Sequence, residues 1–438
     1  MNIRTRFAPS PTGYLHIGSL RTALYAYLFA KNQGGELILR VEDTDRSRYV
    51  EGAVESLIDV LTRMSIDYDE GPVIKNGKLE EKGSYGPYTQ SERTEMYKKY
   101  ADELIEKGHA YRCFCSADRL ESMRKEQQLA KMPTKYDRHC CSLTDEEVQK
   151  KLDMKEPYVV RMKVPAGETV VDDLIRGKVK FNNEEVDDQV LMKSDGFPTY
   201  HLAVVVDATA MEISHVIRAE EWLTSTPKHI MLYNMLGFKA PTYAHLPMVL
   251  NPDKSKLSKR QGDVAVEDYL AKGYLPEALN NFVALLGYNP KGDQEIYTMD
   301  ELIKLFDLSK VNSSGAVFNT EKLDWMNSQY IKAKDIDELV DLAQVFLARA
   351  EKTVDEKRLE KIVTVERERM NRLDEIVEMV DMYQTEPEFA DPAILIWKKS
   401  DAADAKTMLG GLIEQIENMK DDDFAELGLV ETVIKGYI

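Results

Sequence analysis

The sequence predicts an α/β domain at the amino terminus, split by an α+β insertion and followed by an all-helical carboxyl-terminal region. Strand and helix patterns alternate over roughly the first forty residues, which implies a parallel sheet. Strand-like runs return after a long interruption, and helical periodicity dominates from Ala265 onward. With 438 residues the chain is long enough for about three domains.

The individual elements follow from turn signals and hydrophobic spacing. Residues 3–8 predict a strand that two prolines end, because proline lacks the donor for a strand ladder. Apolar residues at helical spacing predict a helix over 20–31, which a Gly-Gly pair ends. One long amphipathic helix is expected over 359–380. Further strands are expected at 36–42, 158–164, 190–193, 199–206 and 213–218.

Composition and charge limit the function. A hydrophobic content of 43% and a charged content of 31% suit a soluble globular protein. The amino terminus has no signal-peptide pattern and no apolar run approaches membrane-spanning length, so we expect a cytoplasmic protein without a membrane partner. The net charge of -18 disfavours nucleic acid as a partner unless a local basic face exists.

A phosphate-binding turn is predicted where the first strand passes into the first helix. Residues 6–19 read Arg-Phe-Ala-Pro-Ser-Pro-Thr-Gly-Tyr-Leu-His-Ile-Gly-Ser. The start of a helix offers unpaired N–H groups and a partial positive charge to an anion. Gly18 permits close approach of a nucleotide, and His16 can donate to a phosphate oxygen. An isolated His-x-Gly is more often a turn histidine with a capping glycine, so the motif needs a second signal.

The lysine-rich loop at 254–260 supplies that signal. It reads Lys-Ser-Lys-Leu-Ser-Lys-Arg and is the densest basic cluster in an acidic chain. Most charge runs are solvated loops. Cations that engage charge as it develops on leaving phosphate oxygens, however, lower the barrier of phosphoryl chemistry. The two motifs together therefore indicate a site that holds ATP phosphates from two sides.

In this order, the two motifs resemble the signatures of class I aminoacyl-tRNA synthetases, and more narrowly those of bacterial-type glutamyl-tRNA synthetases. The segments Gly-Pro-Tyr-Thr-Gln-Ser-Glu-Arg at 86–93 and Leu-Asp-Trp-Met-Asn at 323–327 extend the resemblance. It implies a Rossmann-type catalytic domain over 1–96 and 189–250, an acceptor-binding insertion over 97–188, a stem-contact region over 251–322 and a helical anticodon-binding region over 323–438.

The resemblance implies an ATP-dependent ligase that forms glutamyl-adenylate and transfers glutamate to the terminal adenosine of tRNA-Glu. ATP is expected to act with Mg²⁺. Lys259 is implied to neutralise the leaving pyrophosphate, with Lys256 assisting and Ser258 shaping the loop. The residues implied to bind ATP are His16, Gly18, Glu221, Trp222, Lys256, Ser258 and Lys259.

A glutamate site should offer arginines to two carboxylates and an acid to one ammonium. The resemblance assigns Arg6 and Arg218 to the carboxylates. Glu42 ends a predicted strand, and ligands of open α/β sheets bind at the carboxyl ends of strands, so we expect it to bind the ammonium. The resemblance also places Ala8, Ser10 and Tyr200 in the pocket.

All four cysteines lie between Cys113 and Cys141, and this bunching favours a zinc site over scattered thiols. The resemblance assigns Cys113, Cys115 and Cys140 as ligands of a structural zinc ion. The fourth ligand stays open: Tyr136 by resemblance, or His139 or Cys141 by chemistry.

Two alternative functions belong to related proteins. One is a paralogue of the glutamyl-queuosine type, which glutamylates a tRNA base; the helical region counts against it. The other is a catalytically dead tRNA-binding paralogue, which the intact motifs disfavour. The partners expected are L-glutamate, ATP and tRNA-Glu acting on a monomer, with charging of tRNA-Gln left open. Relatives extend beyond the point matching Ile438, so a shortened anticodon-binding region is expected.

Overall fold

The computed structural model describes residues 2–257, 265–290, 292–385, 391–397, 400–420, 424 and 427–437. The chain divides into two compact units, Met1–Ile376 and Val377–Ile438, and each is described by itself. Among the described residues, no helix is long and apolar enough to cross a membrane.

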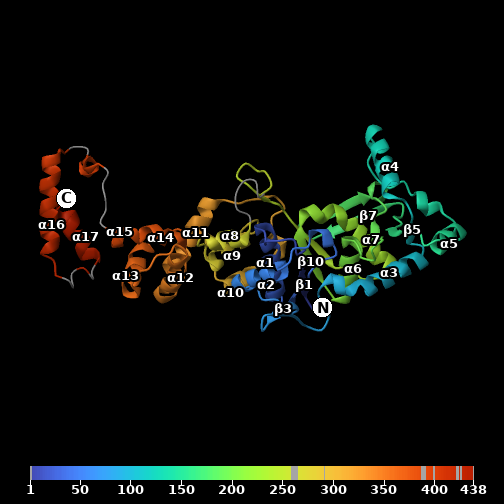
Figure 1. Cartoon of the computed structure of the whole chain (residues 1–438), viewed down its shortest axis with the longest axis horizontal. Coiled ribbons are helices and arrows are strands. Elements are labelled where there is room, and N and C mark those ends of the chain that lie inside the picture. The colour runs from blue at the N-terminus through green and yellow to red at the C-terminus, as the bar shows by residue number, and fades with distance from the viewer. Residues whose placement is uncertain are drawn as a thin grey trace. The chain divides into compact units, whose positions relative to one another are not determined.

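A parallel βαβ arrangement opens the first unit, as the sequence predicts (Figure 1). β1 (Arg4–Phe7) and β2 (Glu36–Leu39) pair in parallel, and α1 (Ile17–Asn32) connects them. A side-chain carbon on Gly35 would lie 2.1 Å from the carbonyl oxygen of Ile3, so only glycine lets β2 begin so close to β1.

Two further parallel strands lie beside β1. β10 (His215–Ala219) and β11 (Thr242–Leu246) pair in parallel. The backbone N–H of Ser214 donates to the carbonyl oxygen of Arg4 at 2.9 Å, which joins β10 to β1. Since the strands run in one direction, their carboxyl ends meet at one edge. The helices along these strands are α2 (Ala53–Arg63), α6 (Tyr200–Ala210) and α7 (Thr226–Leu236).

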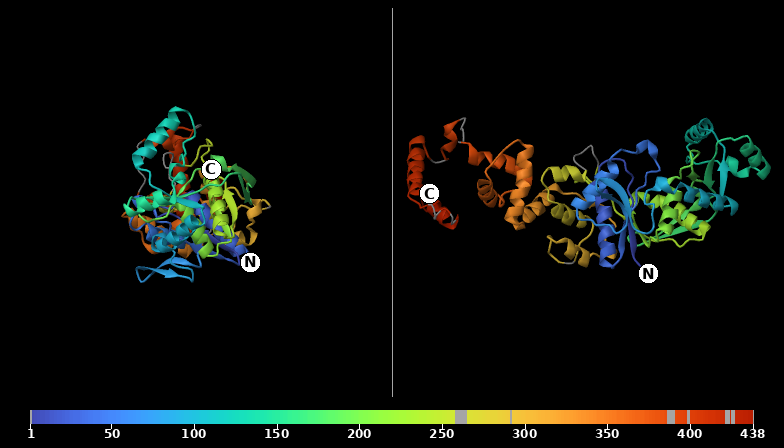
Figure 2. Two further views of the ribbon diagram at one scale, coloured as in Figure 1. Left: turned by 90° about the vertical axis from the view of Figure 1, so that its right-hand side faces the viewer. Right: turned by 60° about the horizontal axis from the view of Figure 1, so that its bottom comes forward.

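The sheet is covered on both faces, so its strands are largely buried. Leu37 and Leu39 of β2 pack in one core together with residues of α1, α2 and α9 (Pro276–Ala284). Ile38, between them, packs in the other core with residues of α3 (Thr94–Glu106), α6 and α7. Figures 1 and 2 show the yellow helices α8 and α9 on one side of the blue strands, and the teal segment with α4 and α5 on the other.

The segment between the two halves of the parallel sheet is mixed α and β, as predicted. Its three-stranded sheet is antiparallel in the order β5, β6, β9, and a hairpin of β7 and β8 continues from β11. The elements are α4 (Ala117–Leu129), α5 (Asp145–Asp153), β5 (Ala110–Cys113), β6 (Val159–Met162), β7 (Glu168–Asp173), β8 (Gly177–Asn182) and β9 (Val190–Met192). A separate hairpin consists of β3 (Gly71–Lys75) and β4 (Lys78–Lys82).

Residues 199–206 form the start of α6, so the strand predicted there is wrong. The run of β-branched residues over 204–206 favours a strand when taken alone. Leu202, Ala203 and Val205 are completely buried, and packing on both sides overrides the intrinsic preference. The strands predicted at 158–164, 190–193 and 213–218 are confirmed as β6, β9 and β10, with shorter bounds.

Helices dominate the rest of the first unit, but the single long helix predicted over 359–380 is wrong. α13 ends at Glu366, and the backbone N–H groups of Arg369 and Met370 turn back to the Glu366 carbonyl oxygen. The side chain of Asn327 then donates to the carbonyl oxygen of Asn371 at 2.6 Å, which fixes an extended break. The elements here are α8 (Val266–Ala271), α10 (Met299–Leu305), α11 (Thr320–Ala333), α12 (Ile336–Arg349), α13 (Glu356–Glu366), β12 (Val249–Leu250) and β13 (Ala316–Val317). α14 (Ile376–Met379) begins at the last residue of this unit, and its other residues belong to the second unit.

The second unit is helical where it is described. Asp401 caps the start of α16, accepting from the backbone N–H groups of Ala403 and Asp404. Its helices are α15 (Asp381–Gln384), α16 (Ala402–Glu417) and α17 (Leu427–Tyr437).

Short 3₁₀ turns occur along both units at Arg46–Arg48, Gln90–Arg93, His139–Ser142, Asn183–Glu185, Glu220–Ser225, Leu308–Lys310, Leu373–Glu375 and Pro392–Leu395.

Candidate active site

A cavity of about 950 Å³ lies at the carboxyl ends of the parallel strands. Strand ends from β1, β2 and β10 and the first turn of α1 contribute to its wall. The predicted site residues that line it are Arg6, Ala8, Ser10, His16, Gly18, Glu42, Tyr200, Arg218, Glu221, Trp222 and Lys256. The predicted residues Ser258 and Lys259 lie outside the described part of the chain.

The first turn of α1 opens onto this cavity. His16 is the residue before the helix, and its carbonyl oxygen accepts from the backbone N–H groups of Ser19 and Leu20 at 2.8 Å. A side-chain carbon built on Gly18 would meet no atom within 4 Å, so the space in front of this turn is open. An anion could therefore approach the partial positive charge at the start of α1.

Arg218, on β10, is held on several sides by polar side chains. It donates to Tyr200 Oη at 2.9 Å, to Thr226 Oγ1 at 2.8 Å and to His245 Nε2 at 3.0 Å. His245 in turn contacts Asp173 through Nδ1 at 2.6 Å. Because Asp173 accepts at Nδ1, the lone pair of His245 Nε2 faces the arginine. The guanidinium is thus fixed in position at the cavity wall.

Neutral histidines surround this arginine. Burial and the charge of Arg218 lower the pKa of His229 well below its usual value. Burial, with the charges of Lys228 and Arg218, lowers the pKa of His201 to about 3. The two rings contact each other, with His201 Nδ1 3.1 Å from His229 Nε2. The group therefore adds hydrogen-bonding capacity without adding positive charge near pH 7.

Arg6 and Glu42 place opposite charges in the same wall. Arg6 donates to the carbonyl oxygen of Ile217 at 2.7 Å. Burial and the charge of Arg40 lower the pKa of Arg6 to about 10. Glu42 Oε1 accepts from the buried Arg40 at 2.9 Å, and burial nevertheless raises the pKa of Glu42. Together with Arg218, this part of the wall thus offers two arginines and one carboxylate to a ligand.

Other residues that line the cavity are more exposed. The Tyr200 and Trp222 rings lie 4.5 Å apart between centroids, and Trp222 is 38% exposed. Lys256 forms an ion pair with Glu221 at 2.6 Å, and both side chains are largely exposed. Such a pair stabilises the fold little, so Lys256 can exchange this partner for another anion at small cost.

Comparisons with known proteins identify two families that the chain matches. Residues 2–325 match the family model of tRNA synthetases class I (E and Q), catalytic domain, and residues 338–437 match that of an anticodon binding domain. The glutamate–tRNA ligase of Clostridioides difficile is 50% identical over 391 residues, covering 87% of this chain and 79% of the relative. That of Alkaliphilus metalliredigens is 48% identical over 442 residues, covering 98% and 89%.

The chain belongs to the glutamate–tRNA ligase family of class I aminoacyl-tRNA synthetases. A crystal structure of a glutamate tRNA ligase from Elizabethkingia meningosepticum, in complex with its amino acid, has a TM-score of 0.87 and 37% identity. The match covers 100% of this chain and 90% of that one. The predicted family, and the predicted order of an α/β catalytic domain before a helical anticodon-binding domain, are confirmed.

A cysteine cluster lies outside the cavity of this synthetase-family chain. Among the described residues, Cys113, Cys115 and Cys140 have sulfur atoms within 4.8 Å of one another. Tyr136 Oη lies 3.3 Å from the sulfurs of both Cys113 and Cys115. Cys141 does not belong to this group. Three converging thiols fit the ligand preference of zinc.

Several residues of the cavity and its support do not follow from the sequence motifs. Gln90 lines the cavity, and Arg40 donates a hydrogen bond to the Glu42 carboxylate. His245 pairs in register with Arg218 across neighbouring strands, so a correct pairing of β10 with β11 is the signal that finds it. His229 has no such signal, because it reaches Arg218 from a helix.

Proposed function

We propose that this chain catalyses the ATP-dependent ligation of glutamate to tRNA, the reaction for which its relatives are named. One observation carries the proposal: a single cavity is lined by the buried arginines Arg6 and Arg218, the buried carboxylate of Glu42 and the start of a helix. This set complements the two carboxylates and one ammonium of glutamate beside the phosphates of ATP.

The residues divide between the two substrates. Arg6 and Arg218 bind the carboxylates of glutamate and Glu42 binds its ammonium. Arg218 must exchange one protein partner for the substrate, and the Tyr200 hydroxyl, whose residue lines the cavity, is the partner that it releases. The small neighbours Ala8 and Ser10 complete this half. The nucleotide half consists of His16, Gly18, Glu221 and Trp222.

The reaction proceeds in two transfers. A carboxylate oxygen of glutamate attacks the α-phosphorus of ATP, and the bond to pyrophosphate breaks. Lys259, with Lys256 assisting and Ser258 shaping the loop, stabilises the departing pyrophosphate; Mg²⁺ bound to ATP would share in neutralising its charge. A ribose hydroxyl at the tRNA terminus then attacks the acyl carbon, and AMP leaves. The protein supplies position and electrostatics rather than a nucleophile.

Pyrophosphate exchange tests the proposal. Exchange should require glutamate, ATP and tRNA, and the double variant Lys256→Ala, Lys259→Ala should lose about a hundredfold or more, as expected when charge stabilisation of a transition state is removed. Lys310→Ala is the matched control, since Lys310 pairs with Asp307 on the surface and does not line the cavity. Normal exchange in the double variant would contradict the role of the loop.

The cysteine cluster is proposed to hold a structural zinc ion, with Cys113, Cys115 and Cys140 as thiolate ligands. Tyr136 is the favoured fourth ligand, because its hydroxyl lies near the sulfurs while His139 is exposed at the surface. The ion would stabilise the insertion and has no part in the chemistry of the cavity.

Metal analysis of the purified protein tests this site. About one zinc ion per chain is expected, and Cys140→Ser should lose most of it. Cys141→Ser is the matched control, since Cys141 is the adjacent residue and lies outside the sulfur group. Equal zinc content in both variants would show that Cys140 is not a ligand. Zinc loss in Tyr136→Phe would support the tyrosine, and retention would favour His139.

The tRNA substrate is proposed to be tRNA-Glu, and charging assays with purified tRNA-Glu and tRNA-Gln decide whether the second is also used. The anticodon-domain match over 338–437 supports attachment at the tRNA terminus rather than at a base. Product that survives removal of the 3′ terminus would reverse this conclusion, and absence of glutamyl-adenylate would indicate the inactive paralogue. The four domain boundaries, the monomeric state and the cytoplasmic location stay predictions.

A further inference from the structure

Gln90 lies beside the proposed ammonium site but has no role in the scheme above. Its backbone N–H donates to the carbonyl oxygen of Val41 at 3.0 Å, so the backbone of Gln90 runs next to the strand end that carries Glu42. The Gln90 side chain is fully buried and contributes to the cavity wall. It belongs to the segment 86–93, whose sequence alone suggests no chemistry.

The orientation of the Gln90 carboxamide is fixed by Asp207. Gln90 Nε2 donates to Asp207 Oδ2 at 2.8 Å. Arg93 Nε donates to the other oxygen at 2.8 Å, and the Tyr97 hydroxyl lies 2.9 Å from it. Because an ionised carboxylate only accepts hydrogen bonds, the amide nitrogen of Gln90 must face Asp207 and its oxygen must face away.

That oxygen is an unsatisfied acceptor. Among the described residues, Gln90 Oε1 is buried and has no hydrogen-bond partner. Leaving a buried acceptor without a partner costs on the order of 1–3 kcal/mol, so a missing donor is the physical expectation. Carboxylates and phosphates cannot supply that donor, whereas the ammonium of an amino acid carries three N–H groups.

The neighbouring Glu42 narrows the choice of ligand group. Arg40 holds Glu42 through Oε1 at 2.9 Å, which leaves Oε2 for the ligand. Arg40 also lies 3.7 Å from Asp207 Oδ2, the oxygen that orients Gln90. One buried network therefore holds both Glu42 and Gln90, which line the same cavity. The Glu42 carboxylate and the Gln90 amide oxygen can both accept hydrogen bonds from an ammonium group.

We propose that the Gln90 side-chain oxygen accepts a hydrogen bond from the ammonium of the bound amino acid and, together with Glu42, positions it. This inference rests on the proposed function, because it uses the glutamate site assigned there. Gln90 is thus a specificity-determining residue: it favours ligands with an α-ammonium over dicarboxylates of the same length that lack one.

The test compares glutamate with glutarate, which keeps both carboxylates and lacks the ammonium. Dissociation constants of both are measured for the wild-type chain and for Gln90→Met, which keeps the length of the side chain and removes its acceptor. The variant should bind glutamate about tenfold to a hundredfold more weakly, as for a lost hydrogen bond to a charged group, and glutarate as before. Equal loss for both ligands, or loss for neither, overturns the inference.

Tyr97→Phe is the matched control. It removes another hydrogen bond to Asp207, from a buried residue that does not line the cavity. It should change neither dissociation constant. If Tyr97→Phe weakened glutamate binding as much as Gln90→Met does, disturbance of Asp207 would explain the loss without a hydrogen bond from the ammonium to Gln90, which would contradict the proposal. If Gln90→Met does not fold, Gln90→Asn, which retracts the oxygen by one carbon, is assessed in the same way.

The proposed function fails separately from this inference. A wild-type chain that does not prefer glutamate to glutarate would contradict the ammonium site itself. A wild-type preference that persists unchanged in Gln90→Met would contradict only the role of Gln90.

Discussion

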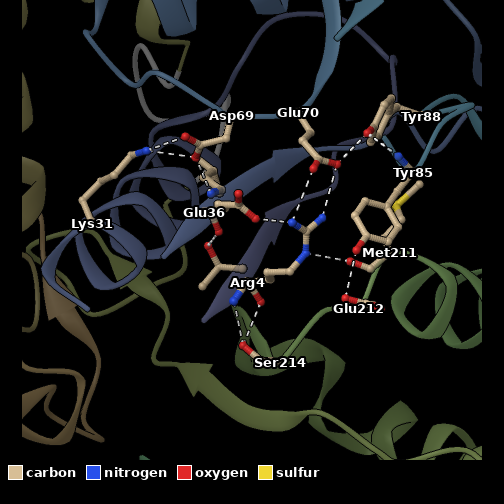
Figure 3. Close-up of polar contacts among 12 residues, drawn as sticks. Arg4, Lys31, Glu36, Asp69, Glu70, Tyr85, Tyr88, Met211, Glu212 and Ser214 are labelled. Atoms are coloured by element: carbon tan, nitrogen blue, oxygen red, sulfur yellow. Dashed lines mark hydrogen bonds and ion pairs between the residues drawn. The ribbon is translucent and has the colours of Figure 1, made fainter. Parts of the chain in front are cut away.

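Arg4 and Arg6 lie two residues apart on β1 but have different environments: Arg4 is paired with acidic residues inside the fold, and Arg6 lines the cavity. Figure 3 shows Arg4 enclosed by Glu36, Glu70 and the carbonyl oxygen of Met211. Its Nε donates to Met211 at 3.0 Å and its Nη2 to Glu70 at 3.2 Å. Although burial opposes it, the hydrogen bond and charge of Glu70 raise the pKa of Arg4.

Arg6 has the opposite environment. Its guanidinium contacts the carbonyl oxygen of Ile217, lines the cavity and lies near the positive charges of Arg40 and Arg218, although Glu42 offsets part of them. A buried charge is costly without a counter-charge. Arg4 therefore stabilises the fold, whereas Arg6 keeps a buried positive charge for which a substrate carboxylate can supply the counter-charge.

Replacing Arg4 should give the largest effect. Arg4→Met leaves Glu70 buried beside the Tyr88 hydroxyl without its cation, and the free energy of unfolding should fall by about 3–5 kcal/mol, as when one partner of a buried pair is removed. Urea denaturation measures this. A decrease of less than about 1 kcal/mol in the free energy of unfolding would mean that Arg4 does not stabilise the fold more than a surface ion pair does.

Replacing Arg6 should affect activity instead. Arg6→Met is expected to slow pyrophosphate exchange about 10²- to 10³-fold, as for loss of a buried charged partner of the substrate. Its free energy of unfolding should stay the same or rise, because the removed charge is unfavourable in the empty cavity. Exchange and urea denaturation on the same preparation separate the two effects. A large loss of stability with normal activity would reverse the assignments.

The cavity end should also be the pH-sensitive end. The pKa of His201 is lowered to about 3, mainly by burial, so below pH 6.5 the unfolded chain binds a proton that the folded chain does not. Stability from this residue is therefore complete above pH 6.5 and is lost as the pH falls; at pH 5.5 the loss is about 1.4 kcal/mol. Unfolding of wild type and His201→Asn at pH 7.5 and 5.5 checks this. The variant should show the smaller pH dependence.

The smallest change in the free energy of unfolding is expected for the partly exposed ion pair of Lys31 with Asp69. Lys31 contacts Asp69 at 2.8 Å, and both side chains are about one-third exposed or less (Figure 3). Lys31→Met should lower the free energy of unfolding by about 0–1 kcal/mol, since partly exposed ion pairs contribute little. Measured in the same urea series, it is the control for Arg4→Met; a loss equal to that of Arg4→Met would remove the distinction between buried and exposed pairs.

Much of the site could be predicted because the motifs are local. Arg6, His16 and Gly18 belong to one strand–turn–helix segment, and their chemistry follows from that local geometry. Glu42 was predicted from its place at a strand end, and it does line the cavity. The strand predicted over 199–206 fails because burial on both sides makes a β-branched run stable as a helix. The long helix over 359–380 fails because a side chain from α11 fixes the break.

The family, the parallel βαβ start, the helix-start phosphate turn and eleven of the residues that line the cavity follow from sequence patterns alone. These depend on patterns within a few residues of one another. Three features required the folded chain: Arg4 is enclosed while Arg6 faces the cavity, Cys141 lies outside the sulfur cluster, and Gln90 keeps an unsatisfied oxygen. Each of these depends on partners distant in the chain, since hydrogen bonds and charges act over a few ångströms of space and not over sequence distance.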